Sequence, residues 1–384
     1  MQFVLSPILR RGLVEVFFLT FTPALFLRSI HLTNYKNHAD RSLDFSRKIN
    51  CFIGPNGMGK TNILDAIHYL SLTKSYFSST DQQNIRIGAD FMRLTGAVTV
   101  QEQDYRIVCR LPQGRKKDFT VNDLPYKRMS DHVGMMPVVM IAPDDSVLIS
   151  GSSEERRKFL DNTLSQTDHE YLEHLVRYNK YLDQRNALLK SMNAGGRHDA
   201  VLLEGYDEQL VRYGESVYRR RRQALSELEP IFSHYHRLVS LEREQTSFSY
   251  ESTMNERPLA DQLRDNLPRQ ILLERTSAGP HRDDIAFMLG DTRLKRFGSQ
   301  GQQKSFLIAL KLAQYHYIRA HKSFHPFLLI DDIFDKIDGE RSRQLVQLLS
   351  GEDFGQIFIT DTDEQHITDE LGADTALFDI YQIP

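Results

Sequence analysis

The chain has 384 residues, enough for one large domain or two medium-sized domains with a substantial core. Its formal net charge is −3, so the composition excludes a protein that is strongly basic overall, and any nucleic-acid contact must come from local basic patches. The two cysteines, Cys51 and Cys109, exclude a disulfide framework and a cysteine-rich metal site, and they favour a reducing, cytoplasmic setting.

Residues 1–26 form the first distinct segment, in which Arg10 and Arg11 precede an apolar stretch. This order superficially matches a signal peptide or a short membrane anchor. However, Glu15 interrupts the apolar run, no small-residue cleavage site follows, and the run is shorter than the roughly 20 residues that cross a bilayer. We therefore expect a disordered N-terminal extension and no membrane-spanning segment.

Residues 27–45 alternate apolar and polar side chains around a turn, which predicts a β-hairpin. Residues 49–53 are apolar, residues 54–59 are rich in glycine, and apolar residues then recur at helical spacing up to Leu72. A strand, a glycine-rich loop and a helix are the context that the phosphate-binding pattern G-x-x-x-x-G-K-[ST] requires. The alternative is an ordinary strand–turn–helix connection. The full pattern predicts that the chain binds a nucleoside triphosphate.

Each residue type in this loop has a physical role in phosphate binding. Glycines let the backbone curl so that N–H groups point at the β-phosphate, and the helix N-terminus adds partial positive charge. Lys60 would neutralise charge on the β- and γ-phosphates, and Thr61 would ligate Mg²⁺ through its hydroxyl. We assign nucleotide binding to Gly54, Asn56, Gly57, Gly59, Lys60, Thr61 and Asn62.

Residues 91–111 read as a second hairpin, and a basic turn separates it from further strand-like sequence at residues 118–126. Residues 137–141 are continuously apolar and are followed by a proline and two aspartates, which predicts a buried strand.

The composition changes near Gly151. Apolar residues then recur at spacings of three and four over residues 154–192 and 203–228, with a glycine pair between the two stretches. We expect two long amphipathic helices in an antiparallel hairpin, which either projects from the globular part or packs flat on it. The four arginines at 219–222 form either a solvated helix face or a phosphate-binding surface.

Residues 247–255 are polar, and their pattern does not distinguish a helix from a strand or a loop. The pattern of residues 259–276 favours a helix, and that of residues 285–289 favours a strand. His281, between the last two elements, is weak support for any function by itself. A further helix is expected to begin at Ser299, a good N-cap residue, and Gly301 would let a ligand approach the first-turn N–H groups. Such a helix start suits a phosphate, but capping alone also explains Ser299.

Residues 327–330 form an apolar run that ends in Asp331 and Asp332. A carboxylate at the tip of a buried strand is the expected Mg²⁺ partner of a phosphate loop, so Asp331 would hold the metal directly or through water. Asp332 would act as general base toward the attacking water. Adjacent carboxylates at a strand end also start turns or cap helices. A last apolar strand, residues 356–360, ends in Asp361.

The segments GPNGMGKTN, SQGQQK and LLIDDIFDKID resemble the Walker A, signature and Walker B motifs of ABC-type ATPases. Within that class the chain resembles the RecF family of bacterial DNA-repair ATPases, which are related to SMC heads. The segments LTNYKNH, VNDLPYKRMSDHVG, IAPDDSVLISGSSEERRKFLDN and SAGPHRDDIAFML carry the resemblance further. It covers residues 27–384 and implies an α/β ABC-type P-loop ATPase head, with a mixed sheet and flanking helices, plus a helical arm.

The resemblance also implies a dimer in which two chains sandwich ATP. Ser299, Gly301 and Gln302 would then contact the nucleotide in trans, and Asp338 would lie at the dimer interface. ATP would close the dimer on DNA that is gapped, single-stranded, double-stranded or joined at a junction, and slow hydrolysis would release the DNA. The protein would help RecO and RecR to load RecA. Candidate DNA contacts, chosen on charge alone, are Arg115, Lys116, Lys117, Arg219, Arg220, Arg221 and Arg222.

Some positions depart from the family pattern. Asp65 stands where glutamate is usual, and Thr360-Asp361-Thr362 stand where transporter ATPases carry a switch histidine, so we expect no water-orienting role for Thr360. We place the equivalent of the Q-loop at residues 143–145. The segment 1–26 has no family counterpart.

We expect an extension at residues 1–26, the N-terminal part of the head at 27–150, the helical arm at 151–276 and the C-terminal part of the head at 277–384. A nucleotide-binding subunit of an ABC transporter shares the three motifs but does not explain the arginine-rich insertion. A small-molecule kinase would leave SQGQQ unexplained. A scaffold that binds ATP without hydrolysing it remains an alternative, because Asp332 is a weaker proton acceptor than a glutamate with a raised pKa.

Overall fold

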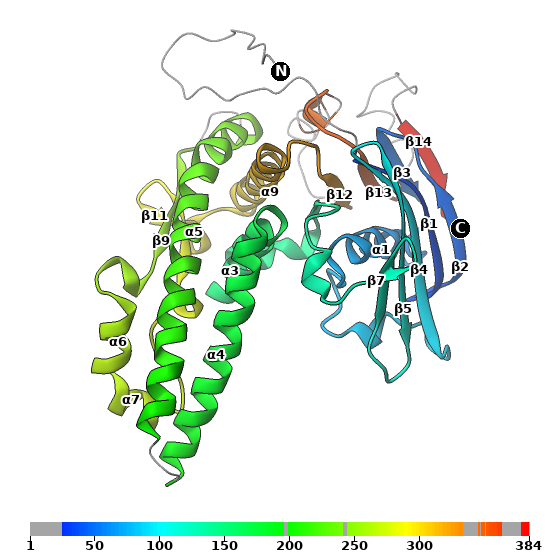
Figure 1. Ribbon diagram of the computed structural model, residues 1–384. Helices are drawn as coiled ribbons and strands as arrows, with labels where there is room; N and C mark the ends of the chain where they lie inside the picture. The colour runs from blue at the N-terminus through cyan, green and yellow to red at the C-terminus, as the bar shows by residue number, and fades with distance from the viewer. Residues whose placement is uncertain are drawn as a thin grey trace, which may run out of the picture.

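A computed structural model describes residues 25–195, 199–240, 244–332, 345, 347–349, 351–362 and 378–383. Figure 1 shows a head built on sheets and an arm of helices that projects from one side of it. Most of the N-terminal segment 1–26, and Asp338, lie outside the described residues.

The head is organised around a parallel sheet of five strands in the order β14-β3-β13-β12-β8. The strands are β3 (Ile49–Ile53), β8 (Val138–Ile141), β12 (Phe327–Asp331), β13 (Ile357–Asp361) and β14 (Phe378–Gln382). Because parallel strands end at one edge of a sheet, the glycine-rich loop after β3 and the acidic residues at the end of β12 meet at the same edge.

Side chains of this sheet alternate between two cores, one on each face. Cys51 packs with the core that contains helices α3 (Ser153–Thr167) and α9 (Gln300–Lys322), whereas Phe52 packs on the opposite face with α1 (Lys60–Leu72). Because helices cover both faces, β8, β12 and β13 are almost continuously apolar up to the residues that end them, which is the pattern that the sequence showed.

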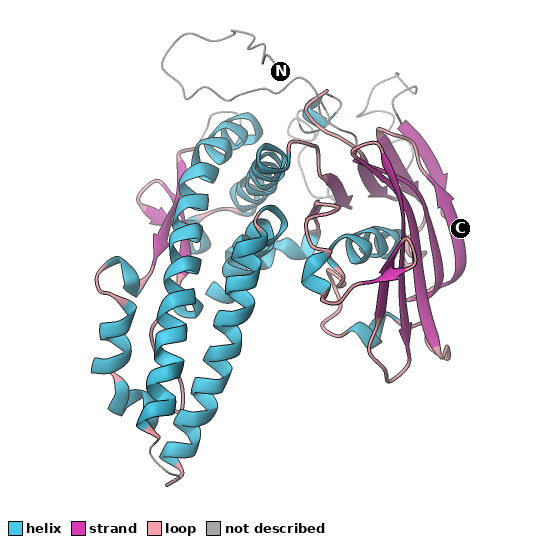
Figure 2. Cartoon of the chain, in the orientation of Figure 1, coloured by secondary structure: helices cyan, strands magenta, loops and turns pink. Residues whose placement is uncertain are grey.

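Helix α1 lies between the parallel sheet and a six-stranded antiparallel sheet, as Figures 1 and 2 show. The second sheet has the order β2-β1-β4-β5-β6-β7. Its strands are β1 (Leu25–Tyr35), β2 (His38–Asp44), β4 (Phe91–Val100), β5 (Gln103–Pro112), β6 (Asp118–Val121) and β7 (Leu124–Pro125). Both predicted hairpins are confirmed. However, β1 begins at Leu25, inside the segment expected to be an extension.

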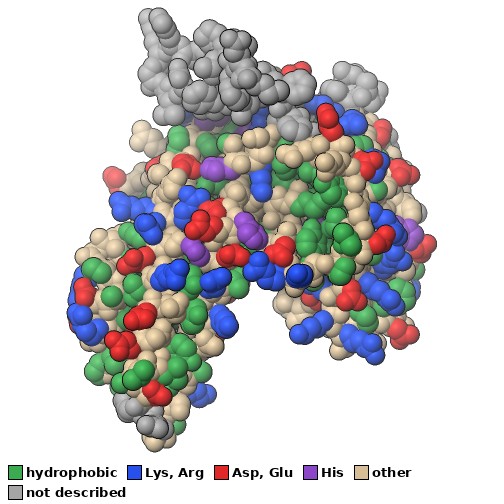
Figure 3. Space-filling model, in the orientation of Figure 1, with side chains coloured by type: hydrophobic (Ala, Val, Ile, Leu, Met, Phe, Trp, Pro, Cys, Tyr) green, Lys and Arg blue, Asp and Glu red, His purple; other side chains and the backbone are tan. Residues whose placement is uncertain are grey.

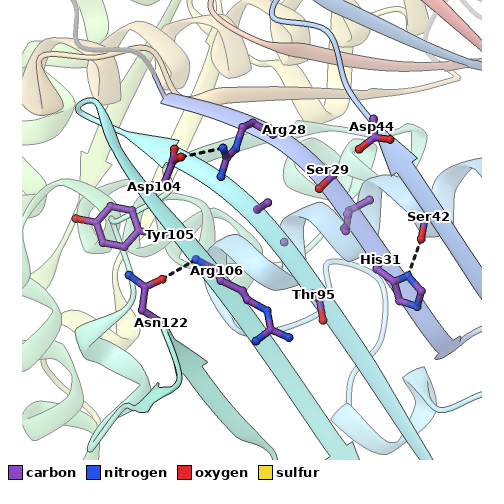
Figure 4. A pocket seen from close by; sticks show the side chains of 13 residues that line it. Arg28, Ser29, His31, Ser42, Asp44, Thr95, Asp104, Tyr105, Arg106 and Asn122 are labelled. Atoms are coloured by element: carbon purple, nitrogen blue, oxygen red, sulfur yellow. Dashed lines mark hydrogen bonds and ion pairs between the residues drawn. The ribbon is translucent and has the colours of Figure 1, made fainter.

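The antiparallel sheet carries a pocket of about 480 Å³ that is lined by residues of β1, β2, β4 and β5. Figure 4 shows Arg28 paired with Asp104 at 2.8 Å, and His31 Nδ1 2.6 Å from the Ser42 hydroxyl. None of the residues that the sequence assigns to nucleotide or DNA binding lines this pocket.

The arm consists of the predicted helical hairpin and two shorter helices. Helices α4 (His169–Asn193) and α5 (Ala200–Ser240) lie side by side along its length (Figure 1), with α6 (Leu259–Asp265) and α7 (Leu267–Leu272) beside them. The hairpin projects from the head, yet the C-terminal part of α5 packs against α9, so each of the two expected arrangements holds for part of it.

Two stretches predicted as continuous helices are broken. Asp168 separates α3 from α4, and its carboxylate caps α4 by accepting a hydrogen bond from the Tyr171 N–H at 3.0 Å. Asn266 divides the helix expected at 259–276, and Pro268 lies in the first turn that follows. Apolar periodicity continues across both breaks, so it does not reveal them. Because α3 packs in the head core, we propose that the arm begins at α4.

A three-stranded antiparallel sheet in the order β11-β10-β9 lies against α3 and α5. Its strands are β9 (Thr246–Glu251), β10 (Asp284–Leu289) and β11 (Thr292–Arg293), so β10 confirms the predicted strand and β9 fills the ambiguous segment. The short helices are α2 (Val147–Ser150), α8 (Leu294–Phe297) and five 3₁₀ turns, η1 (Asp81–Asn84), η2 (Met129–Asp131), η3 (Pro143–Ser146), η4 (Thr253–Asn255) and η5 (Pro280–Arg282).

Candidate active site

The loop after β3 depends on glycines that adopt positive φ. The angle is +87° at Gly57 and +97° at Gly59, a region that glycine enters without steric cost. At Gly59, a Cβ atom would lie 2.5 Å from the side-chain amide of Asn37 and 2.7 Å from His38 Nε2. Helix α1 begins directly afterwards, at Lys60, so its N-terminus adjoins the loop.

The turn between β1 and β2 supports the loop, a contact that the sequence did not reveal. Asn62 Nδ2 donates a hydrogen bond to Asn37 Oδ1 at 2.8 Å, and His38 Nε2 lies 3.1 Å from the carbonyl oxygen of Gly59. Burial lowers the pKa of His38, so at neutral pH the ring is uncharged and Nε2 carries the donated proton. The only sequence signal was the polar turn inside the first predicted hairpin.

Lys60 is buried, with 4% of the residue exposed, and its side chain folds back over the loop. Its Nζ donates to the carbonyl oxygens of Gly54 at 2.7 Å and Pro55 at 3.1 Å. Phosphate oxygens carry a full negative charge and are stronger acceptors for an ammonium than these carbonyls. The side chain can therefore exchange them for β- and γ-phosphate oxygens beside the same loop.

Asp331, the last residue of β12, is the centre of a cluster of hydroxyl and carboxylate groups. Its Oδ1 accepts hydrogen bonds from the hydroxyls of Thr61 and Thr360, both at 2.8 Å. Burial raises the pKa of Asp331, and the negative charge of Asp332 adds to that rise, whereas the two hydroxyl hydrogen bonds oppose it. The fold thus joins residues 61 and 331, which are far apart in the chain.

Asp332 adopts φ +40°, in the left-handed region. Its N–H donates to Thr360 Oγ1 at 3.0 Å, and its Oδ1 lies 3.3 Å from the same hydroxyl. Thr360 lies on the neighbouring strand β13 and is completely buried. Its hydroxyl touches both acidic residues. It is the main residue of this site to which the sequence assigned no role.

The donor set suits Mg²⁺, which prefers hard oxygen ligands. The Thr61 hydroxyl and the Asp331 carboxylate lie 2.8 Å apart and are the two groups of the described site that would hold the ion. Mg²⁺ beside a nucleotide is usually bound by one or two protein groups together with phosphate oxygens and water, and these two side chains would be the protein groups.

The start of α9 has the predicted cap. Ser299 Oγ accepts a hydrogen bond from the Gln302 N–H at 3.3 Å, and Gln302 Oε1 accepts one from the Ser299 N–H at 2.8 Å, which makes a capping box. Ser299 is exposed, so another molecule can reach the first turn of the helix. Capping thus accounts for the local roles of both side chains, and nucleotide contact by Ser299, Gly301 and Gln302 stays a prediction.

Two residues named as DNA contacts are paired with carboxylates, one of them inside the protein. Arg221 is 3% exposed, pairs with Asp161 at 2.8 Å and donates to the Pro280 carbonyl at 2.7 Å. Lys117, with 15% of its side chain exposed, pairs with Asp81 at 2.9 Å. The expectation of phosphate contact is therefore corrected for Arg221, because a buried guanidinium that is paired with a carboxylate is not presented to DNA. Phosphate contact by Lys117 stays a prediction.

The other arginines and lysines of the two basic runs differ in their surroundings. Arg220 donates to Asp168 at 2.8 Å and is partly exposed. The exposed members are Arg115, Lys116, Arg219 and Arg222. They remain candidates for DNA contact.

Asp65, which departs from the family pattern, is a buried structural residue. It pairs with Lys36 at 2.6 Å and accepts hydrogen bonds from the hydroxyls of Tyr35 and Ser75, both at 2.7 Å. Burial raises its pKa, but the Lys36 charge and the hydrogen bonds outweigh this and hold the pKa below the ordinary range. Aspartate is one methylene group shorter than the usual glutamate, which suits a position where the partners lie this close to the carboxylate.

The segment proposed as the Q-loop equivalent is tied to the helix that carries the signature. Asp145 accepts a hydrogen bond from the Ala142 N–H at 2.7 Å and pairs with Lys311 of α9 at 3.0 Å. Tyr76, which follows α1, also donates its hydroxyl to Asp145. The assignment to a Q-loop stays a prediction.

The chain can now be compared with known proteins. The family model for the RecF/RecN/SMC N terminal domain matches residues 26–379. Over 338 residues the chain is 43% identical to the DNA replication and repair protein RecF of Flavobacterium johnsoniae, covering 88% of this chain and 94% of the relative. The chain belongs to the RecF family. A RecF protein of Bacteroides fragilis is also 43% identical, over 92% of this chain and 96% of its own length.

Solved RecF structures share the fold. The structure described as the recombination mediator protein RecF-ATP in the RecFOR pathway superimposes with a TM-score of 0.84 over 90% of this chain and 94% of that one, at 27% identity. The Smc head domain of Pyrococcus furiosus has a TM-score of 0.53 at 15% identity, which shows likeness of fold alone. The predicted ABC-type head with a helical arm is confirmed. Within the described part of this RecF-family chain, no helix is long and apolar enough to cross a membrane.

Proposed function

We propose that this RecF-family protein binds ATP with Mg²⁺ and hydrolyses it slowly, as an ATP-sandwiched dimer on DNA, in recombinational repair and replication. The observation that carries the proposal is the 2.8 Å contact between Thr61 of the phosphate loop and Asp331 at the end of β12. It places two oxygen ligands for a metal beside Lys60, which is the arrangement that phosphoryl transfer requires.

Mg²⁺, when bound, would neutralise phosphate charge and help to orient the γ-phosphate. Thr61 and Asp331 hold its position, and the loop N–H groups with Lys60 bind the β- and γ-phosphate oxygens. Asp332 accepts the proton of the attacking water as general base. Thr61 at the start of α1 and Asp331 at the end of β12 are already in contact, so the geometry of the two metal-binding groups is largely set before the nucleotide arrives.

A second chain would complete the site. The first turn of α9 carries Ser299, which is exposed, and Gly301, which is partly exposed, and the partial positive charge of a helix N-terminus favours the negative charge of a γ-phosphate. If that turn faces the nucleotide of a partner chain, hydrolysis depends on dimer formation, and ATP affinity for the closed dimer shifts the monomer–dimer equilibrium.

DNA would contact the closed dimer through local basic groups. On the face shown in Figure 3, basic and acidic side chains are interspersed over arm and head, so no single basic surface dominates. The exposed candidates are Arg115, Lys116, Arg219 and Arg222. The related RecF–ATP structure is named for the RecFOR pathway, which supports RecO and RecR as partners. RecA downstream and the cytoplasm as the location are further parts of this proposal, which come from the family resemblance alone.

One experiment tests the proposal at the nucleotide, at the dimer and on DNA. ATP hydrolysis and sedimentation are measured with and without a gapped duplex for the wild type, Lys60→Ala and Ser299→Arg. We expect DNA to stimulate hydrolysis and ATP to drive dimerisation in the wild type. Lys60→Ala should lose both because phosphate binding is lost, and Ser299→Arg should bind ATP but stay monomeric. Ser226→Arg, on an exposed face of α5, is the matched control.

Each part of the proposal has an outcome that removes it. Wild-type hydrolysis that ignores DNA would contradict the repair function, and an ATP-driven dimer without any hydrolysis would identify a scaffold instead of an ATPase. An ATP-dependent dimer of Ser299→Arg would remove the trans contact of the signature.

A further inference from the structure

Thr360 lies between the two acidic residues of the site, and its hydroxyl both donates and accepts a hydrogen bond there. The side chain is fully buried. Its oxygen accepts the Asp332 N–H at 3.0 Å, and its single proton is directed to Asp331 Oδ1 at 2.8 Å, with Asp332 Oδ1 as the second acceptor within reach at 3.3 Å. One hydroxyl therefore links the backbone of Asp332 to the carboxylates of both residues.

The order of the sheet puts Thr360 in this position. Strand β13 lies between β3, which carries the phosphate loop, and β12, which carries the acidic residues. In the register, Thr360 pairs with Asp331 on one side and with Phe52 on the other. Because β13 is paired on both sides, a side chain at position 360 is held at the edge of the sheet where the nucleotide site lies.

The backbone of Asp332 needs such a partner. Its φ of +40° lies in the left-handed region, which an aspartate enters less readily than the right-handed one. The hydrogen bond from its N–H to Thr360 Oγ1 stabilises this conformation at the point where the chain leaves β12. The same turn brings the Asp332 carboxylate back toward Thr360, so that Oδ1 lies 3.3 Å from the hydroxyl.

Building on the ATPase function proposed above, we propose that Thr360 is a positioning residue for ATP hydrolysis, which fixes the direction of the Asp332 carboxylate while it orients Asp331. It acts through the two acids and has no contact of its own with the water. This role differs from the water-orienting role of the switch histidine in transporter ATPases, and it needs the hydroxyl group and not just the volume of threonine.

The test compares variants that remove or keep the hydroxyl. Thr360→Val keeps the shape of the side chain and removes the hydroxyl, whereas Thr360→Ser keeps the hydroxyl. The control Thr163→Val removes another completely buried hydroxyl, which donates to the Phe159 carbonyl at 2.8 Å and is far from the two acids in sequence. Turnover at saturating Mg²⁺–ATP with gapped duplex, ATP affinity and thermal stability are measured for each. Asp332→Asn and the double variant Thr360→Val/Asp332→Asn complete a cycle.

We expect Thr360→Val to lower kcat about tenfold or more, as part of the roughly 10²–10⁴-fold that a positioned general base contributes, with ATP affinity nearly unchanged. Thr360→Ser should restore most of the turnover, and Thr163→Val should leave kcat at the wild-type value. Thr360→Val should lower turnover by a smaller factor in the Asp332→Asn background than in the wild type, because the part of its effect that acts through Asp332 is already lost there.

Several results would overturn the positioning role. Normal turnover of Thr360→Val, or a loss of turnover that Thr360→Ser does not restore, would show that the hydroxyl is not needed. A loss in the Asp332→Asn background as large as the loss in the wild type would show that Thr360 does not act through Asp332. Normal turnover of Asp332→Asn would remove the proposed general base itself, and a wild type that hydrolyses no ATP would remove the proposed function; neither result depends on Thr360.

Discussion

Arg221 and Arg222 are adjacent in a run of four arginines, yet the fold gives them opposite surroundings. Arg221 is buried against Asp161, whereas Arg222 is exposed. Successive residues of a helix point about 100° apart, so a run of like charges on α5 cannot all face solvent when one side of the helix packs on the protein. The role of each residue therefore follows from its environment, as it does for Thr360 between two carboxylates.

Gly59 allows a quantitative prediction at this scale. Gly59→Ala should destabilise the protein by about 1–3 kcal/mol and abolish ATP binding, because the new methyl group meets a positive φ and the side chains of Asn37 and His38. Gly57→Ala is the matched control, since its φ is also positive but a Cβ there meets nothing within 4 Å. Urea unfolding of the two variants measures the difference. Equal losses of stability would show that the contact with Asn37 and His38 is unimportant.

At the scale of elements, buried polar pairs connect parts of the head that are distant in sequence. Lys311 of α9 and Asp145 after β8 form an ion pair whose side chains are 4% and 5% exposed. Lys311 also donates to the Tyr76 hydroxyl at 3.0 Å and to the Met140 carbonyl at 2.8 Å. The Tyr76 N–H in turn donates to Asp65 of α1 at 2.7 Å. The helix that begins with the signature is thus linked to the helix that follows the phosphate loop.

Breaking this pair on one side should be costly. Lys311→Met leaves Asp145 buried without its cation, so we expect a loss of about 3–5 kcal/mol in the free energy of unfolding. Lys158→Met, which breaks an exposed pair with Glu154 (2.9 Å), should cost less than about 1 kcal/mol. Chemical denaturation of both variants provides the comparison. A loss at Lys311 as small as that at Lys158 would contradict a connecting role for the pair.

At the scale of the whole molecule, buried histidines make the fold sensitive to acid. Burial lowers the pKa of His68 and of His132 to about 4. It likewise lowers the pKa of His281 and His325 to about 4 and that of His316 to about 3. In the unfolded chain these groups titrate near 6.5. The unfolded state therefore binds protons at a pH where the folded state does not.

The free energy of unfolding should consequently be constant above about pH 6.5 and fall as the pH drops toward about 4. At about pH 5 each such histidine should lower it by on the order of 1–2 kcal/mol. Urea unfolding at pH 7.5 and pH 5.0 measures the difference. His132→Gln should reduce the pH-dependent part, whereas His169→Gln, whose side chain is 51% exposed, should not. The same stability at both pH values would contradict the prediction.

Local sequence determined most of the elements of this protein and the candidate residues of its site. The phosphate loop, the apolar strands that end in Asp331 and Asp361, and the helix capped by Ser299 were all predicted, because each depends on residues within a few positions of one another. Ordered motifs along the chain were also sufficient for the ABC-type fold and the RecF family, which the comparisons confirm.

Tertiary structure decided which side chains meet. Sequence patterns could not show the burial of Arg221, the support of the phosphate loop by Asn37 and His38, or the place of Thr360 between two acids. The same is true of the break at Asp168, where a capping hydrogen bond interrupts an unbroken periodicity. The physical reason is that these properties depend on contacts between strands and helices far apart in the chain, whereas periodicity and motif spacing report only on neighbours.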